Sequence, residues 1–173
     1  MPNLPLIEDG ADPRIAKIYE EVTGAGRGFP NLYRLLGHAP AMLQAWCDFA
    51  WPLRNAAKTP RALRELMILR GAQLMGADYE WVHHLEIAHA AGVSQAKIDA
   101  LKDGHAAPAF DARERAALRI AEEVTHGPGA SAEAIAEAKR HFDDGEIVEL
   151  TLTASFYACV GRVLHSLQVP LEK

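Results

Sequence analysis

Residues 61–101 read RALRELMILRGAQLMGADYEWVHHLEIAHAAGVSQAKIDAL, and this stretch carries clear signals for the class of fold. Its apolar residues recur with the period of an amphipathic helix, and no run alternates as a strand does. Thr59 and Pro60 are expected to begin the first helix, as an N-cap followed by proline at the first helical position. Gly76 and Gly92 are expected to end two successive helices. The stretch therefore predicts two helices joined by a tight turn.

The same signals extend to both ends of the chain and predict an all-α fold, a compact orthogonal bundle of seven or eight helices. One helix is predicted from Asp12 and Pro13 to Gly24, and another from Pro40 to just before Pro52. Further helix starts are predicted from two capping boxes, Asp111/Glu114 and Asp143/Glu146, and from two serine N-caps, Ser94 and Ser131.

The composition and charge of the chain indicate which kinds of binding partner are not expected. The net charge is −5 with neutral histidines, so nucleic-acid binding through phosphate contacts is not expected. No run of about 18 apolar residues predicts a membrane span, and the N-terminus lacks the pattern of a signal peptide. We therefore expect a cytoplasmic protein whose two cysteines, Cys47 and Cys159, are reduced and buried.

Three polar side chains fall on apolar helix faces. On a helical wheel, Glu80 and His84 lie about 40° apart inside the apolar stripe of their helix. Glu65 occupies a similar position on the preceding helix, whereas Arg61 and Arg64 fall outside the stripe. Because the two helices are joined by a tight turn, we expect the three polar side chains to meet in one pocket.

Two carboxyls and an imidazole on apolar faces suit acid/base chemistry. Burial and a neighbouring carboxylate raise a carboxyl pKa, while the imidazole stays useful near neutral pH. Such a set supplies a general acid and a general base without a metal. The alternative is structural, since a Glu/His pair four residues apart can also be a satisfied core pair or a subunit contact.

Residues 61–101 also resemble the signature block of the carboxymuconolactone decarboxylase family, the all-helical group that includes alkylhydroperoxidase D. In the alkylhydroperoxidase D branch, a glutamate precedes a Cys-x-x-Cys motif and a histidine follows it. On this chain the glutamate matches Glu65, the cysteine positions hold Ala77 and Glu80, and the histidine matches His84. Without either redox cysteine, thiol-dependent peroxide reduction is not expected. The decarboxylase branch, which also lacks these cysteines, looks more similar.

The resemblance implies an alkylhydroperoxidase D-like fold over residues 1–173, with residues 1–58 as a helical extension that packs on a 59–173 core. It also implies a homo-oligomer, as a dimer, trimer or hexamer. No metal or other cofactor is expected: the order Glu80, His83, His84 differs from zincin spacing, and no glycine-rich phosphate loop is present. Arg162 and Trp81 are the candidates for substrate binding.

These observations favour a cofactor-independent lyase or isomerase acting on a small anionic lactone or carbonyl compound, most similar to carboxymuconolactone decarboxylase. Glu80 and His84 would form the acid/base pair, and Glu65 would orient His84 or relay its proton. Two alternatives stay open. One is a peroxidase-related protein that uses Cys47 or Cys159 as the nucleophile, and the other is a non-enzymatic helical oligomer.

Overall fold

The computed structural model describes residues 2–8, 12–23 and 29–172, and this part of the chain contains helices and no strand. The predicted all-α fold is therefore confirmed, with nine α-helices rather than seven or eight among the described residues. The helices are α1 (Pro13–Thr23), α2 (Asn31–Leu36), α3 (Pro40–Asn55), α4 (Arg61–Met75), α5 (Asp78–Ala90), α6 (Gln95–Ala100), α7 (Ala112–His126), α8 (Ala132–Ala138) and α9 (Asp144–Leu167), with a 3-10 turn at Leu101–Asp103.

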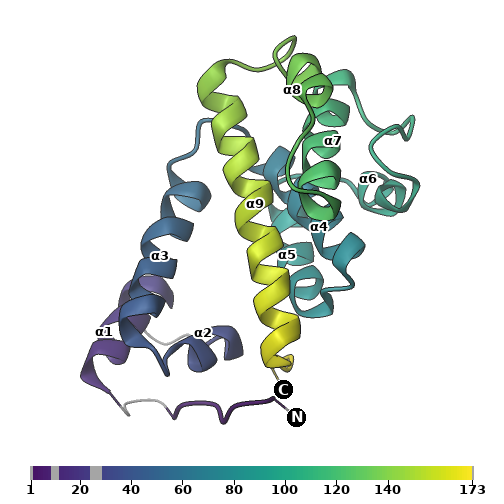
Figure 1. Cartoon of the computed structure of the whole chain (residues 1–173). Coiled ribbons are helices and arrows are strands. Elements are labelled where there is room, and N and C mark those ends of the chain that lie inside the picture. The colour runs from purple at the N-terminus through teal and green to yellow at the C-terminus, as the bar shows by residue number, and fades with distance from the viewer. Residues whose placement is uncertain (1, 9–11, 24–28, 173) are drawn as a thin grey trace.

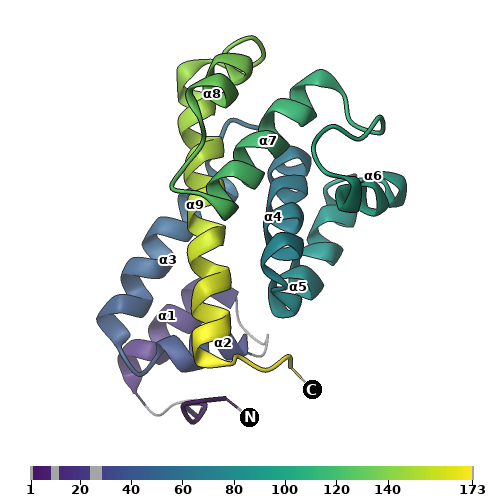
Figure 2. The same ribbon diagram turned by 45° about the vertical axis from the view of Figure 1, so that its right-hand side comes forward.

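The long helix α9 stands at the centre of the molecule. It packs against α4 and α7 on one side and against α3 on the other, and it also contacts α5 (Figures 1 and 2). By length and composition α9 could cross a membrane, but 56% of its most apolar window is buried inside the protein. Its apolar character is thus accounted for by core packing.

Helices α1, α2 and α3 gather on the opposite side of α9 from α4 to α8 (Figure 1). One core cluster fills the space between these N-terminal helices and α9, around Tyr19, Leu43 and Phe156. Two others join α4 and α7 to α9 and to the α5–α6 region. The assignment of residues 1–58 to a separate extension stays a prediction, although the helices within these residues do lie together.

Most helix ends follow the predicted local signals. Both capping boxes form, at Asp111 and at Asp143, and Gly76 ends α4 with a left-handed φ of 64°. Two predictions are wrong. Pro60 rather than Thr59 occupies the N-cap of α4, and α3 runs through Pro52 to Asn55. The predicted end of α1 at Gly24 lies outside the described residues.

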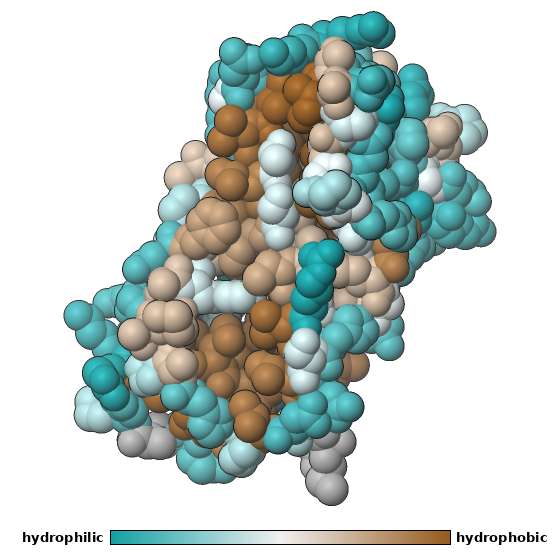
Figure 3. Space-filling model, viewed as in Figure 1, coloured by the Kyte–Doolittle hydropathy of each residue, from teal (hydrophilic) through white to brown (hydrophobic). Residues whose placement is uncertain are grey.

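The face shown in Figure 3 carries a band of apolar side chains where α3 and α9 approach the viewer. Exposed apolar residues on these two helices include Met42, Phe49, Val148 and Leu152. The homo-oligomer expected from the family resemblance stays a prediction, since a single chain is described.

Candidate active site

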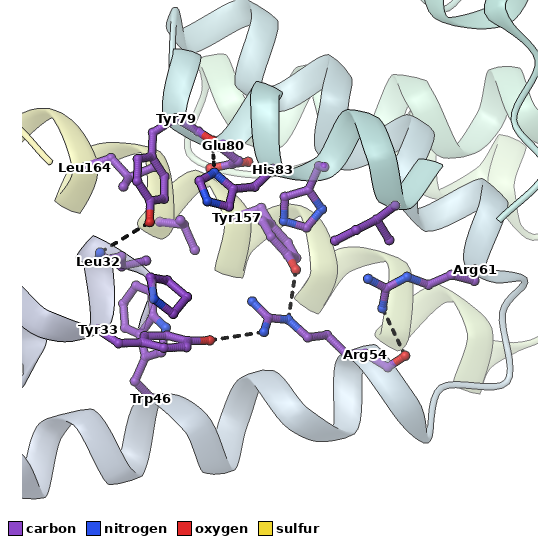
Figure 4. Close-up of a pocket in the computed structure, with 14 residues that line it drawn as sticks. Leu32, Tyr33, Trp46, Arg54, Arg61, Tyr79, Glu80, His83, Tyr157 and Leu164 are labelled. Atoms are coloured by element: carbon purple, nitrogen blue, oxygen red, sulfur yellow. Dashed lines mark hydrogen bonds between the residues drawn. The ribbon is translucent and has the colours of Figure 1, made fainter. Parts of the chain in front are cut away.

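A cavity of about 370 Å³ lies between the N-terminal helices, α5 and α9. Its volume is in the range of small-molecule sites. Figure 4 shows side chains from both sides of the molecule pointing into the same space. The lining residues are Pro30, Leu32, Tyr33, Trp46, Arg54, Arg61, Tyr79, Glu80, His83, His84, Ile87, Tyr157, Val160 and Leu164.

A chain of three side chains runs from the cavity into the core. His84 Nδ1 lies 2.7 Å from Glu65 Oε2, and Glu65 is fully buried behind it. Arg61 Nη2 lies 2.6 Å from the other oxygen, Glu65 Oε1, as an ion pair without the alignment of a hydrogen bond. The expected meeting of Glu65 and His84 is present, and Arg61 supplies the charge that balances the buried carboxylate.

This arrangement determines which ring nitrogen of His84 carries the proton. Burial lowers the pKa of His84, against the opposing effect of Glu65, so the neutral ring is favoured at pH 7. A carboxylate can only accept, so the Nδ1–H of the neutral ring donates to Glu65. The lone pair of Nε2 is then available at the cavity, as a general base requires.

Glu80 is the most unusual group in the cavity wall. It is 2% exposed, and neither carboxyl oxygen has a hydrogen-bond partner among the described residues. Burial, and then the charge of Glu65, raises the pKa of Glu80 well above its usual range. The neutral acid is therefore favoured at pH 7. A buried polar group without a partner costs free energy, which a ligand that bonds to it would recover.

Arg54 approaches the same space from α3. Its Nε donates to the Tyr157 hydroxyl at 3.3 Å and its Nη1 to the Tyr33 hydroxyl at 3.1 Å (Figure 4). Among the described residues no carboxylate pairs with Arg54, and the side chains that accept hydrogen bonds from its guanidinium are the two tyrosines. A guanidinium placed in this way is suited to bind an anionic ligand group.

The two predicted substrate-binding residues lie elsewhere. Arg162 is exposed in a separate groove of α9 with Ser155 and Cys159, and its Nη1 donates to Ala158 O at 3.1 Å. Its position on α9 is about 140° around the helix from Tyr157, which does face the cavity. Trp81 is partly buried and packs on the cluster between α4, α6 and α7. Neither residue lines the cavity with Glu80 and His84.

The cavity also contains residues for which no role was predicted from the sequence. Tyr33 and Arg54 come from the N-terminal helices, for which the sequence carried no positional signal. His83, which precedes His84 in the chain, lines the cavity at its partly exposed rim. Arg61 could have been found, because it lies four residues before Glu65, the spacing of a helical ion pair.

The two cysteines are free and lie outside this cavity. Cys47 is buried, and burial raises the pKa of its thiol to about 11. The expectation that both thiols are buried is wrong for Cys159, which is exposed on α9. Within residues 2–8, 12–23 and 29–172, no group of three or more His, Cys, Asp or Glu side chains is arranged to hold a metal ion.

The helical architecture is an alkylhydroperoxidase D-like fold. The alkylhydroperoxidase core of a peroxidase-related protein from Ralstonia eutropha superimposes with a TM-score of 0.85 at 19% identity, covering 99% of this chain and 93% of that one. Residues 40–123 match the model of the carboxymuconolactone decarboxylase family, so this part of the chain is similar to that family.

Two other solved structures share the fold. The debrominase Bmp8, as a variant with one cysteine replaced by alanine and bound to 2,3,4-tribromopyrrole, gives a TM-score of 0.82 at 18% identity over 99% of this chain and 93% of that one. A peroxidase-related protein from Silicibacter gives 0.78 at 19% identity over 99% and 94%. At these identities the likeness concerns the fold alone. No curated protein sequence matches the chain.

Proposed function

We propose that the protein is a cofactor-independent enzyme that transfers protons on a small anionic carbonyl or lactone compound, as a decarboxylase or isomerase. The observation that carries the proposal is Glu80, a buried carboxyl without a partner in the same cavity wall as His84. A neutral acid and a neutral imidazole side by side are the protonation states that acid/base catalysis at pH 7 requires.

His84 is the general base of the proposed site. Its Nε2 takes a proton from the carbon next to the substrate carbonyl, and Glu65 stabilises the imidazolium that forms. Arg61 keeps the negative charge on Glu65, so that the transferred proton stays on the ring. Glu80 donates to the carbonyl oxygen as negative charge develops there. The isomerisation is complete when His84 returns its proton to another carbon of the substrate and Glu80 recovers its own proton from the enol.

Decarboxylation uses the same groups in another order. The carbon–carbon bond to the carboxylate breaks, carbon dioxide leaves, and the electron pair moves into the conjugated carbonyl. Glu80 then supplies a proton to the carbon, and solvent restores that proton after product release. Each turnover therefore consumes one proton and needs no redox partner.

Arg54 takes the binding role that the sequence suggested for Arg162. The Tyr33 and Tyr157 hydroxyls hold its guanidinium in place and leave its remaining N–H groups for a ligand. The charges of Arg61 and Glu65 balance, so Arg54 adds one uncompensated positive charge. A ligand with one carboxylate and an apolar body suits this cavity, whose other walls include Leu32, Trp46 and Val160.

The thiol alternative lacks a thiol at the right place. Neither cysteine lines the cavity, and the raised pKa of Cys47 disfavours the reactive thiolate. Peroxidase chemistry would require a second site, for which these side chains offer no paired thiol.

Carbon dioxide release from 4-carboxymuconolactone tests the proposal. Wild-type release that Glu80→Gln and His84→Ala each reduce at least about a hundredfold would support the assigned acid and base. Arg162→Gln, on the other side of α9, is the matched control and should keep the wild-type rate. An inactive wild type would reject this substrate, and the same variants would then be compared on other lactones and oxo acids by proton exchange with deuterated solvent. Turnover that neither substitution affects would reject the site.

A further inference from the structure

Glu172, in the C-terminal tail, contacts residues at the edge of the cavity. Its Oε1 accepts hydrogen bonds from the backbone N–H of Asn31 and from the Tyr79 hydroxyl, each at 2.6 Å. Its Oε2 lies 2.9 Å from His83 Nε2. One carboxylate thus joins the C-terminus, the first residue of α2 and the first two turns of α5.

Neighbouring contacts reinforce this junction. The Asn31 side chain donates to the Pro170 carbonyl at 3.1 Å, and the Leu32 N–H lies 3.4 Å from the Tyr79 hydroxyl. The rings of Tyr79 and His83 stack with their centroids 4.2 Å apart. The contacts of Glu172, together with those between its neighbouring residues, therefore hold the tail, α2 and α5 together.

Both ring nitrogens of His83 face hydrogen-bond acceptors. Nδ1 lies 2.8 Å from the Tyr79 carbonyl and Nε2 faces the Glu172 carboxylate. Neither acceptor can donate, so a hydrogen bond at either contact is donated by the His83 ring. Because Glu172 is ionised, a hydrogen bond from His83 to it is charge-assisted and stronger than a neutral one.

The junction is placed at the rim of the cavity. Tyr79 and His83 both line the cavity, and so do Pro30 and Leu32 on either side of Asn31. The side chains of His83 and Glu172 are 34% and 36% exposed, whereas that of His84 is only 8% exposed. The contacts of Glu172 therefore position part of the exposed rim of the cavity that contains His84.

We propose that Glu172 is a positioning residue that latches the C-terminal tail and α2 to α5 and so sets access to the cavity. When the carboxylate releases Asn31 and His83, the start of α2 moves away from α5 and the rim opens. The latch makes no contact with the reacting groups. This inference concerns access alone, so it does not depend on the reaction assigned above.

Carbethoxylation of His84 by diethylpyrocarbonate measures access directly. The reagent is small and neutral and acylates an unprotonated imidazole nitrogen, the form that His84 presents to the cavity. Peptide mass spectrometry follows each histidine separately. Glu172→Ala should raise the rate at His84 at least about fivefold, the change in open population expected from losing one charge-assisted hydrogen bond. The exposed His126 should react at an unchanged rate.

Two controls separate the latch from general destabilisation. Glu86→Ala removes an exposed carboxylate from the same helix α5 and should leave the rate at His84 unchanged. Amide hydrogen exchange in α7, which lies away from the tail, should also be unchanged in Glu172→Ala, while the start of α2 loses protection. Deletion of residues 170–173 should reproduce the effect. An unchanged rate at His84 in both Glu172→Ala and the deletion would overturn the proposal, as would loss of protection throughout α7.

Discussion

Glu80→Gln is the substitution that most directly tests the protonation states of the site. Gln has nearly the shape of a protonated Glu but cannot lose a proton. If Glu80 is neutral in the folded protein, the substitution removes the proton donor and leaves the packing of the cavity wall intact. It should therefore abolish turnover without unfolding the protein.

The same substitution has a predicted effect on the pH dependence of stability. The folded-state pKa of Glu80 is raised by burial and by the charge of Glu65, whereas an unfolded Glu titrates near about 4.3. A raised folded-state pKa gives stability that is complete below the unfolded pKa and is lost as pH rises through the folded pKa. Within that window the wild type loses about 1.4 kcal/mol per pH unit through this group.

Glu80→Gln does not titrate, so its stability relative to wild type should rise by the same about 1.4 kcal/mol per pH unit. For a chain of 173 residues this corresponds to a change of about 3–6 °C in the Tm difference per pH unit. Urea denaturation of both proteins from about pH 5 to about pH 8 measures it. Glu86→Gln, the same chemical change at an exposed site of α5, should show no such trend. A stability difference between wild type and Glu80→Gln that stays constant over this range would refute a neutral Glu80.

Three further predictions follow from the geometry. Arg61→Gln leaves Glu65 buried without its cation and should lower the free energy of unfolding, measured by urea denaturation, by about 3 kcal/mol. In a Glu65→Gln background the same substitution should lower it much less. An equal loss in both backgrounds would contradict the ion pair. Arg54→Gln should weaken benzoate binding at least about tenfold in calorimetry while leaving benzamide binding unchanged, and equal effects on both would argue against an anion site. Joint replacement of Cys47 and Cys159 by serine should leave turnover within about twofold of wild type, and a larger loss would revive the thiol alternative.

The parts of the fold that the sequence predicted depend on local interactions. Asp111 and Asp143 bond to backbone groups three residues away, so their capping boxes form wherever the chain is helical. Helix α2 was not predicted, because it has six residues and no side-chain cap and is held instead by four buried side chains. The end of α3 was misplaced at Pro52 for a related reason. Tertiary packing of Leu53 against the N-terminal core carries the helix one turn further.

The residues of the candidate site also divide into those that local sequence patterns could place and those that they could not. Glu65, Glu80 and His84 lie on adjacent helices joined by Gly76, so a helical wheel is enough to bring them together. Arg54 lies before that block, and its approach to the cavity depends on how α3 packs across α9. Such a contact between distant segments leaves no periodic signal in one sequence. The position of Arg162 outside this cavity could not be predicted for the same reason, since the wheel of α9 does not reveal which of its faces the N-terminal helices cover.

Arg61 decides which of the two carboxyls can act as an acid. Glu65 and Glu80 are both almost fully buried near one imidazole, so burial alone would treat them alike. Only Glu65 has a cation at 2.6 Å and an N–H donor at 2.7 Å, and these contacts hold the charge on it. The charge on Glu65 then disfavours a second charge on Glu80. One arginine at the edge of the cavity therefore separates the two groups into an ionised partner for His84 and a neutral proton donor, which is the asymmetry that acid/base catalysis requires.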